Sequence, residues 1–278
     1  MIIPEDIITS KIEGGKTPKE DMTDKKAILD KIVVDSNALT EGEIEKLLAG
    51  YQEHLLVQNH IITEHSSADE EQEKHLDRLL ELEAALDKDW SEVHKSEFIR
   101  ILKKSEEGSP VILIKVLVEL PNIPPEKVNR MIGDIDIRKQ WDNVLSGMRI
   151  FGKIDDHVDH MYSVYKAPIG ISNRDFCQRR IRMSNYKGVP YMIHFKSVNH
   201  EECPPVSSNV RANTIISGYI IRQSHIFKCG TAMTILTQTD IKGQVPTFVV
   251  NMAAARAPSS WCTNFMTNAL KLIKEGKI

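Results

Sequence analysis

The feature that most limits how this chain can fold is a series of strand candidates in its second half. Alternating or β-branched segments occupy residues 148–154, 158–167, 175–184, 190–198, 214–227 and 231–241. A nearly continuous apolar, β-branched run precedes them at residues 111–120. The connections are short or turn-like, whereas parallel strands need long crossover connections. The pattern therefore favours an antiparallel meander over a βαβ architecture.

Helical patterns lie on both sides of the strands. Apolar stripes at helical spacing predict helices over residues 40–55 and 68–87, which either face a core or bind a partner. A short helical stretch is expected at residues 125–146. The last helix is predicted from Pro246 to about Lys274, with a kink at Pro258, because proline in a helix interior removes a hydrogen bond.

The last predicted helix has small apolar residues in its first half and bulky ones after the kink. Its apolar face carries Val249, Val250, Ala253, Ala254 and Ala257, followed by Trp261. A helix that seals a compact core normally uses large residues throughout. Small residues leave space beneath the helix, as a lid over a cavity requires. Close packing of the helix on a sheet would use the same residues, so both interpretations stay open here.

Charge is distributed unevenly along the chain. The net charge of the 278 residues is −3, but residues 1–92 contain 23 Asp and Glu against 10 Lys and Arg, and residues 93–278 contain 16 against 26. A basic body is attracted to phosphate-bearing surfaces, whether membrane or nucleic acid. The acidic front either keeps the protein soluble or masks the basic face. We expect residues 1–68 to form a flexible or helical acidic extension and residues 69–278 to form the main domain.

Several classes of protein are disfavoured by the sequence. No apolar run approaches the roughly 20 residues that span a bilayer, and the first residues do not form a secretory signal. The cysteines are widely spaced, as expected of free thiols in the reducing cytoplasm. The motifs of serine hydrolases, zinc proteases, phosphate loops and dinucleotide sites are missing. No basic motif interleaved with aromatics points to nucleic acid. We expect no enzymatic activity, no cofactor and no metal.

Two charged segments have ordinary explanations at this stage. Segment 155–160, Asp-Asp-His-Val-Asp-His, is expected to form a solvated turn between strands. The arginines at positions 179, 180 and 182 are expected on a solvated strand face.

Arg138 and Asp142 differ from these, because they flank a tryptophan. Four residues apart on a helical segment, they share a face and can pair directly. Trp141 between them indicates that the segment is partly buried. A buried guanidinium can bind a phosphate bidentately while a carboxylate holds it in place. A purely structural ion pair is the alternative that spacing alone supports.

Three motifs resemble, in order and spacing, those of START domains, the lipid-transfer domains related to the steroidogenic acute regulatory protein. The motifs are Arg138-Lys139-Gln140-Trp141-Asp142, Ser172-Asn173-Arg174-Asp175, and Gly243-Gln244-Val245-Pro246 with Asn251-Met252-Ala253-Ala254. The resemblance covers roughly residues 70–278 and is strongest to the family's phosphatidylcholine carriers. It implies an α+β helix-grip fold, in which a curved antiparallel sheet is closed by a long C-terminal helix around a lipid tunnel.

The resemblance also implies a site for the lipid head group. Arg138 would meet the lipid phosphate, with Asp142 beside it. In the phosphatidylcholine carriers an aromatic cage holds the choline by cation–π attraction. Phe176 and Tyr219 match aromatic members of that cage.

The implied cage is incomplete in this chain. Ser163 and Gln238 stand where the carriers have aromatics, and Tyr165 replaces an aliphatic residue. A choline head group therefore fits in part, and a smaller or hydroxyl-rich head group could use Ser163 and Gln238 instead.

A gate is the third element that the resemblance implies. The loop from Lys166 to Ile171 matches the one that contacts the C-terminal helix at the mouth of the tunnel, and its central residues are Pro168, Ile169, Gly170 and Ile171. Its two isoleucines could dip into a bilayer.

These inferences lead to one expected function. We expect a cytoplasmic protein, peripheral at membranes, that carries one lipid, a glycerophospholipid, between membranes. The alternatives are a lipid-sensing adaptor whose N-terminal helices bind a protein partner, and a hydrolase or cyclase that uses the same cavity.

Overall fold

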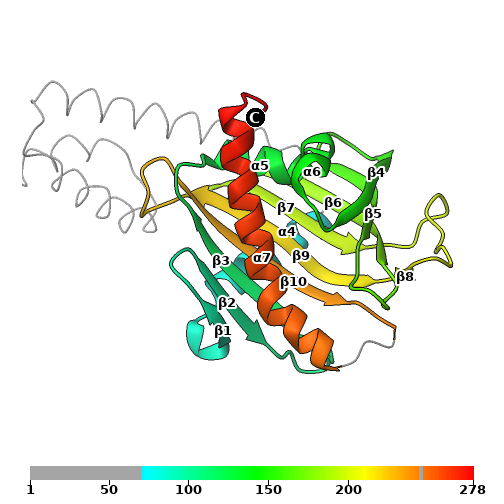
Figure 1. Ribbon diagram of the computed structural model, residues 1–278. Coiled ribbons are helices and arrows are strands. Elements are labelled where there is room, and N and C mark those ends of the chain that lie inside the picture. The colour runs from blue at the N-terminus through cyan, green and yellow to red at the C-terminus, as the bar shows by residue number, and fades with distance from the viewer. Residues whose placement is uncertain (1–69, 244–246) are drawn as a thin grey trace, which may run out of the picture. The chain divides into compact units, whose positions relative to one another are not determined.

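The computed structural model describes residues 70–243 and 247–278, with the backbone alone for residues 247–256 (Figure 1). The predicted helix over residues 40–55 and the acidic extension over residues 1–68 lie outside the described residues.

A single antiparallel sheet forms the body of this domain. Its strands lie in the order β1-β2-β3-β10-β9-β7-β6-β5-β4, and the short β8 adds one parallel pairing to β6. The strands are β1 (Ser91–Lys95), β2 (Ile99–Lys104), β3 (Leu113–Leu120), β4 (Leu145–Lys153), β5 (Val158–Tyr165), β6 (Arg174–Tyr186), β7 (Val189–Ser197), β8 (Val210–Arg211), β9 (Asn213–Gln223) and β10 (Thr231–Asp240). The sheet is strongly curved, as Figure 1 shows.

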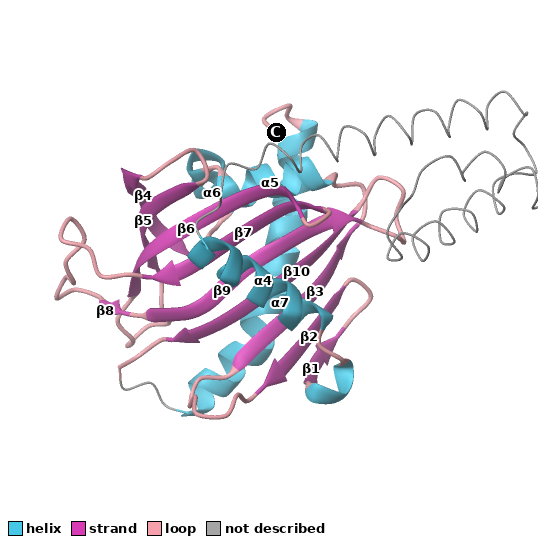
Figure 2. Cartoon of the chain, turned by 180° about the vertical axis from the view of Figure 1, so that it is seen from behind, coloured by secondary structure: helices cyan, strands magenta, loops and turns pink. Residues whose placement is uncertain are grey.

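Helices cover both faces of the sheet. The long α7 (Thr247–Lys274) crosses one face, and α5 (Pro125–Gly133) and α6 (Ile135–Trp141) lie beside its C-terminal half (Figure 1). Figure 2 shows α4 (Glu70–Ala84) lying across the opposite face. The short helix η2 (Asp87–Asp89) leads from α4 into β1. A curved sheet gripped by its C-terminal helix is the helix-grip fold that the sequence predicts.

Each face of the sheet has its own hydrophobic core. Beneath α7, Phe265 and Leu272 pack with α5, α6 and the inner residues of the strands. Beneath α4, Leu76 and Leu79 pack with the outward-facing residues of β6, β7 and β9. Close approach of α4 depends on Gly218, since a Cβ there would collide with Leu79.

Most predicted elements are confirmed, with small changes at their ends. The six strand candidates correspond to β4, β5, β6, β7, β9 and β10, and the apolar run at 111–120 corresponds to β3. The stretch predicted as one helix over 125–146 is two helices, because the Asp134 side chain accepts hydrogen bonds from Asp136 N and Ile137 N and caps a new helix. β1 and β2 were not predicted. Helix α7 continues through Pro258 as one helix.

Candidate functional site

A cavity lies on the face of the sheet that α7 covers. Its volume is about 420 Å³, and it is lined by α6, the gate loop (residues 166–171), and strands β5, β6, β7, β9 and β10. Most of its wall is apolar or aromatic, while hydroxyls of Thr214, Ser217, Thr237 and Thr239 lie along β9 and β10. The arrangement is that of a ligand pocket, which has apolar walls and a few placed polar groups.

Arg138 is the most deeply buried of the three described cationic residues that line this cavity, the others being Lys166 and Arg174. Its Nε donates to Asp142 Oδ2 at 3.2 Å, and the two side chains are 5% and 0% exposed. The guanidinium also lies 5.9 Å from the ring centre of Trp141 and 6.0 Å from that of Trp261. Asp142 takes Nε and the Tyr219 side chain also bonds to the guanidinium, so the remaining N–H groups are the ones that can meet a ligand.

The local electrostatics keep this arginine charged. Burial acts to lower the pKa of Arg138, but Tyr165, Tyr219 and Asp142 outweigh burial and raise it above its ordinary value. Burial also raises the pKa of Tyr219, with the positive charge of Arg138 acting against it. Asp142 Oδ1 has no hydrogen-bond partner among the described residues. A buried, charged guanidinium beside a neutral phenol is therefore available to an anionic group.

Aromatic rings surround the arginine. Tyr165 and Phe176, which line the cavity, meet edge to face with ring centres 5.5 Å apart. The ring centre of Tyr219 lies 6.1 Å from that of Phe195 and 6.2 Å from that of Trp261. The structure thus brings Arg138, Tyr165, Phe176 and Tyr219 together, and it adds Phe195, which the sequence did not suggest.

Ser163 lies on the cavity side of β5 but beneath its surface. Its cross-strand partner is Phe176, and Met161 and Tyr165, two residues away on either side, line the cavity. Residues two apart on a strand share a face. The serine is 0% exposed, and its Oγ has no hydrogen-bond partner among the described residues.

Gln238 does not line the cavity, which corrects the expectation that it contacts the head group. Its neighbours Thr237 and Thr239 line the cavity, so the Gln238 side chain points to the other face of β10. There its Nε2 donates to Ser109 Oγ at 3.3 Å and Val111 O at 3.0 Å. On a strand, an error of one residue in alignment moves a side chain to the opposite face.

The gate loop forms part of the cavity wall. Pro168 and Ile171 line the cavity, and Ile171 N donates to Pro168 O at 3.0 Å across the turn. Gly170 has a φ of +87°, a conformation that favours glycine. Ile169 at the tip is fully exposed.

The Ser172-Asn173-Arg174-Asp175 motif holds this loop in place. Asn173 Oδ1 accepts a hydrogen bond from Ala167 N at 3.1 Å. Arg174 donates to Ser172 O at 2.6 Å, Ile241 O at 3.0 Å and Lys242 O at 2.9 Å, and so ties the gate loop to the segment before α7. Asp175 pairs with Arg211 through two hydrogen bonds. Both charged side chains of the motif therefore have hydrogen-bond partners within the protein.

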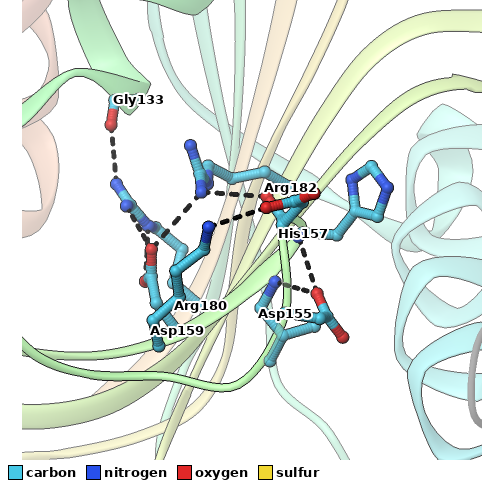
Figure 3. A network of polar contacts seen from close by, with 9 residues as sticks. Gly133, Asp155, His157, Asp159, Arg180 and Arg182 are labelled. Carbon is cyan, nitrogen blue, oxygen red and sulfur yellow. Dashed lines mark hydrogen bonds and ion pairs between the residues drawn. The ribbon is translucent and has the colours of Figure 1, made fainter.

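A second buried arginine was missed by the sequence analysis, which expected a solvated strand face at Arg180 and a solvated turn at Asp159. Arg180 and Asp159 are each 2% exposed and form two hydrogen bonds, of 3.0 and 2.6 Å (Figure 3). Arg180 also donates to Gly133 O at 2.7 Å, at the end of α5. Arg182 reaches Asp159 from the side at 3.5 Å. This network fixes α5, and with it the junction from which α6 carries Arg138. Cross-strand register would have paired Asp159 with Arg180, but only once the strands were correctly aligned.

The predicted lid falls on α7, whose backbone the structure describes. Trp261 is half-buried and donates from Nε1 to Asp142 Oδ2 at 3.4 Å. Ala257 is exposed. The side chains of Val249, Val250, Ala253 and Ala254 lie outside the described part of the structure, so their role as a lid stays a prediction.

Known proteins are similar to this chain in sequence. The START domain family model matches residues 70–267. START domain-containing protein 10 of Homo sapiens is 33% identical over 142 residues, which are 51% of this chain and 47% of that protein. Phosphatidylcholine transfer protein of Mus musculus is 24% identical over 185 residues, which are 66% of this chain and 83% of that protein. The match therefore spans about half the length of the first relative.

Solved structures agree with the sequence matches. The crystal structure of human STARD10 superposes with a TM-score of 0.65 at 25% identity, covering 75% of this chain and 82% of that chain. Human StAR-related lipid transfer protein 5 has the same fold, with a TM-score of 0.64 at 20% identity over 74% of this chain and 96% of that chain. With residues 70–267 matched by the family model, this chain belongs to the START domain family.

Proposed function

We propose that this chain binds one glycerophospholipid in the cavity beneath α7 and carries it between membranes. The observation that carries the proposal is Arg138, a buried cation at the wall of a mostly apolar cavity. A buried charge is costly unless it is paired and hydrogen-bonded, and the hydrogen bonds of Arg138 to Asp142 and Tyr219 do not use all five of its N–H groups. A phosphate group would accept from the remaining nitrogens and complete the pairing. The family membership and the likeness to phosphatidylcholine transfer protein support the same ligand class.

The head group would lie between Arg138 and the aromatic rings. Tyr165, Phe176, Phe195 and Tyr219 offer ring faces to a quaternary ammonium. The threonine and serine hydroxyls along β9 and β10 offer hydrogen bonds to a head group with hydroxyls instead. A choline lipid is therefore one candidate, and a hydroxyl-bearing phospholipid is the other.

Loading a lipid would require the gate to move. A cavity of about 420 Å³ is in the range for drug-sized ligands, so two acyl chains require additional space. Pro168 and Ile171 of the gate loop line the cavity, and Arg174 ties this loop to Ile241 and Lys242, which precede α7 in the sequence. We propose that the gate loop and α7 separate at a membrane surface, where the exposed Ile169 enters the lipid. Burial of acyl chains in an apolar tunnel contributes about 0.8 kcal/mol per CH₂, and no covalent step is needed.

This function places the protein in the cytoplasm, peripherally at membranes. No helix in the described ranges is long and apolar enough to cross a bilayer. We propose residues 69–278 as the lipid-binding domain and residues 1–68 as an attached extension.

Native mass spectrometry of the full chain after incubation with mixed phospholipid vesicles tests the proposal. We expect a one-to-one complex with a phospholipid, and we expect Arg138→Met to lose it. Arg149→Met is the matched control, because Arg149 is an exposed arginine on β4 that does not line the cavity. A wild-type protein that extracts no lipid would refute lipid carriage. Retained pickup by a folded Arg138→Met protein would reduce Arg138 to a structural role.

An adaptor that senses lipid is the second candidate function. Rho GTPase-activating protein 7 of Homo sapiens is 25% identical over 163 residues, which are only 10% of its length, so related sequence occurs within a much larger protein. A transfer assay between donor and acceptor vesicles separates the two functions. A carrier moves lipid at catalytic protein concentration, whereas a sensor binds lipid without accelerating its exchange.

A further inference from the structure

A second cavity lies on the opposite face of the sheet, beside α4. It has a volume of about 370 Å³, and we call it the histidine pocket because its lining includes His75, His160, Arg179, His194, Lys196 and His200. On β6 and β7, Gln178 and Phe195 face the lipid cavity, and the adjacent Arg179 and His194 face the histidine pocket. The two cavities are therefore separated by the sheet.

Two cations are placed directly opposite each other in this pocket. Strand register pairs Arg179 of β6 with Lys196 of β7, and it pairs His160 of β5 with the same arginine. Like charges directly opposite on one face of a sheet destabilise the pairing. Among the described lining residues Glu71 is the only acidic one. Its Oε2 lies 3.6 Å from Arg179 Nη1 and its Oε1 3.5 Å from His75 Nε2, and its side chain is 58% exposed. An exposed ion pair of that length is weak compensation for two cations.

Buried polar atoms in the histidine pocket also lack partners. His194 is 1% exposed, and neither of its ring nitrogens has a hydrogen-bond partner in the described part of the chain. The same holds for the buried Nε of Arg179. Lys196 Nζ lies 3.4 Å from His75 Nε2, within hydrogen-bond distance of the imidazole. Buried polar groups are normally hydrogen-bonded, and unpaired ones call for an explanation.

The histidines respond to this excess of positive charge. Burial lowers the pKa of His75, and Lys196 and Arg179 lower it further against the effect of Glu71. Burial lowers the pKa of His160, with His200 and Arg179 adding to the effect. An anion in the pocket would reverse these charge effects.

We propose that the histidine pocket binds a phosphate-bearing anion, held by Arg179, Lys196 and the imidazole groups of His75 and His160. Phosphate oxygens can accept hydrogen bonds from several donors at once. The donors of this pocket come from α4 and from strands β5, β6 and β7. Arginine and lysine are the residues that most often bind phosphate. A phosphate monoester has a second pKa of about 6, so it and the imidazoles exchange protons in the same range.

NMR of the histidine imidazoles in the full chain, titrated with inorganic phosphate at constant ionic strength, tests the proposal. We expect saturable shifts at His75 and His160 and a rise in their pKa, because a neighbouring anion favours the charged imidazole. Lys196→Met should weaken binding by about tenfold or more, because it removes a charge-assisted hydrogen bond. Lys228→Met is the matched control, since Lys228 is exposed in the turn between β9 and β10, away from the pocket.

Glu71→Gln provides a test of opposite sign. The carboxylate competes with the anion for Arg179, so its neutralisation should tighten phosphate binding, which damage to the fold would not do. Shifts that fail to saturate would overturn the proposal. An unchanged affinity in both Lys196→Met and Glu71→Gln would overturn it as well.

Vesicle binding identifies the source of the phosphate. Phosphatidylcholine vesicles with and without phosphatidic acid are compared for the wild type and for Lys196→Met. Binding that requires phosphatidic acid and Lys196 supports the pocket and assigns a lipid head group. Lys196-dependent binding of inorganic phosphate without a vesicle response supports the pocket and assigns a soluble phosphate compound. A negative result in both arms overturns the proposal.

Discussion

Two buried arginines on the α7 side of the sheet differ in how many protein partners they have. Arg180 has two bonds to Asp159 and one to Gly133 O. Arg138 gives only its Nε to a carboxylate, and its guanidinium otherwise faces rings and the cavity. The first pairing is complete within the protein. The second uses one carboxylate and the Tyr219 side chain, and it leaves N–H groups that an anion could bind. Although both arginines are buried, their partners differ, which gives Arg180 a structural role and leaves Arg138 for the proposed ligand contact.

Arg180→Met should destabilise the protein strongly. The substitution leaves Asp159 buried without its cation, and breaking a buried ion pair costs about 3–5 kcal/mol. Urea unfolding followed by circular dichroism would measure the loss in free energy of unfolding. The double variant Arg180→Met/Asp159→Leu should recover much of it, because no unpaired charge remains. A loss below about 1 kcal/mol would mean that solvent reaches this pair after all.

His194 should make stability depend on pH below neutrality. Burial lowers the pKa of His194 to about 3, with His75 and Lys196 adding to the effect, from an ordinary value of 6.5. Between pH 3 and 6.5, His194 is therefore protonated in the unfolded chain and neutral in the folded protein. The stabilisation is fully present above pH 6.5 and is lost as pH falls from 6.5 toward 3.

Urea unfolding at pH 7, 6 and 5 in phosphate-free buffer measures this effect. We expect the free energy of unfolding to fall by about 1 kcal/mol per pH unit below the unfolded pKa. His194→Phe keeps a ring against His75 and removes the titration, so its slope should be smaller. His225→Phe, at an exposed histidine, should keep the wild-type slope. Equal slopes in all three proteins would show that His194 is protonated in the folded state.

At the scale of elements, residue pattern predicts which segments are strands but not which face each residue joins. Long alternating runs such as those of β6 and β9 were predicted within a few residues of their ends. β1 was missed because Ser91–Lys95 is largely polar, and β2 was missed because Ile99–Lys104 is a short segment with only three apolar residues. Gln238 was assigned to the wrong face beside an irregularity in the β9–β10 register, between Gln238 and Thr239. Alternation fixes a face only when the register is known.

The gate loop should provide part of the attachment to membranes. Ile169 is fully exposed at the tip of this loop. Burying such a side chain yields about 1.5–3 kcal/mol, so Ile169→Ser should lower partitioning onto vesicles by roughly tenfold or more. Vesicle co-sedimentation measures this, and lipid transfer should slow in parallel.

Ile226→Ser is the matched control for the gate. Ile226 is 71% exposed in the turn between β9 and β10 and lines neither the lipid cavity nor the histidine pocket. It should leave vesicle partitioning unchanged. If both serine variants lose affinity equally, the contribution is general surface hydrophobicity and the gate loop has no special role.

At the scale of the whole molecule, the fold could be predicted because its periodicities and motifs agree. Strand alternation, the final long helix and three motifs in register all indicate one architecture. The polar pockets could not be predicted, because each assembles residues from distant elements. The histidine pocket joins α4 to β5, β6 and β7, and Arg180 meets Gly133 across 47 residues of sequence. Such contacts follow from tertiary register, which one sequence does not contain.

The charge of the extension should control how strongly the folded domain is attracted to anionic membranes. Residues 1–68 contain 13 acidic and 7 basic residues, which leaves 26 acidic and 29 basic in residues 69–278. Removing the extension thus changes the net charge from −3 to +3. Among the described residues, those that line the cavity all lie within 138–241, outside the extension, so lipid pickup should persist. Binding to vesicles that contain phosphatidylserine should increase at low salt and return toward the level of the full chain near 1 M salt, where the Debye length is about 3 Å.

Co-sedimentation across a salt series, with neutral phosphatidylcholine vesicles as the control, measures the effect. Equal binding of the two proteins at low salt would show that the acidic extension does not mask the basic domain.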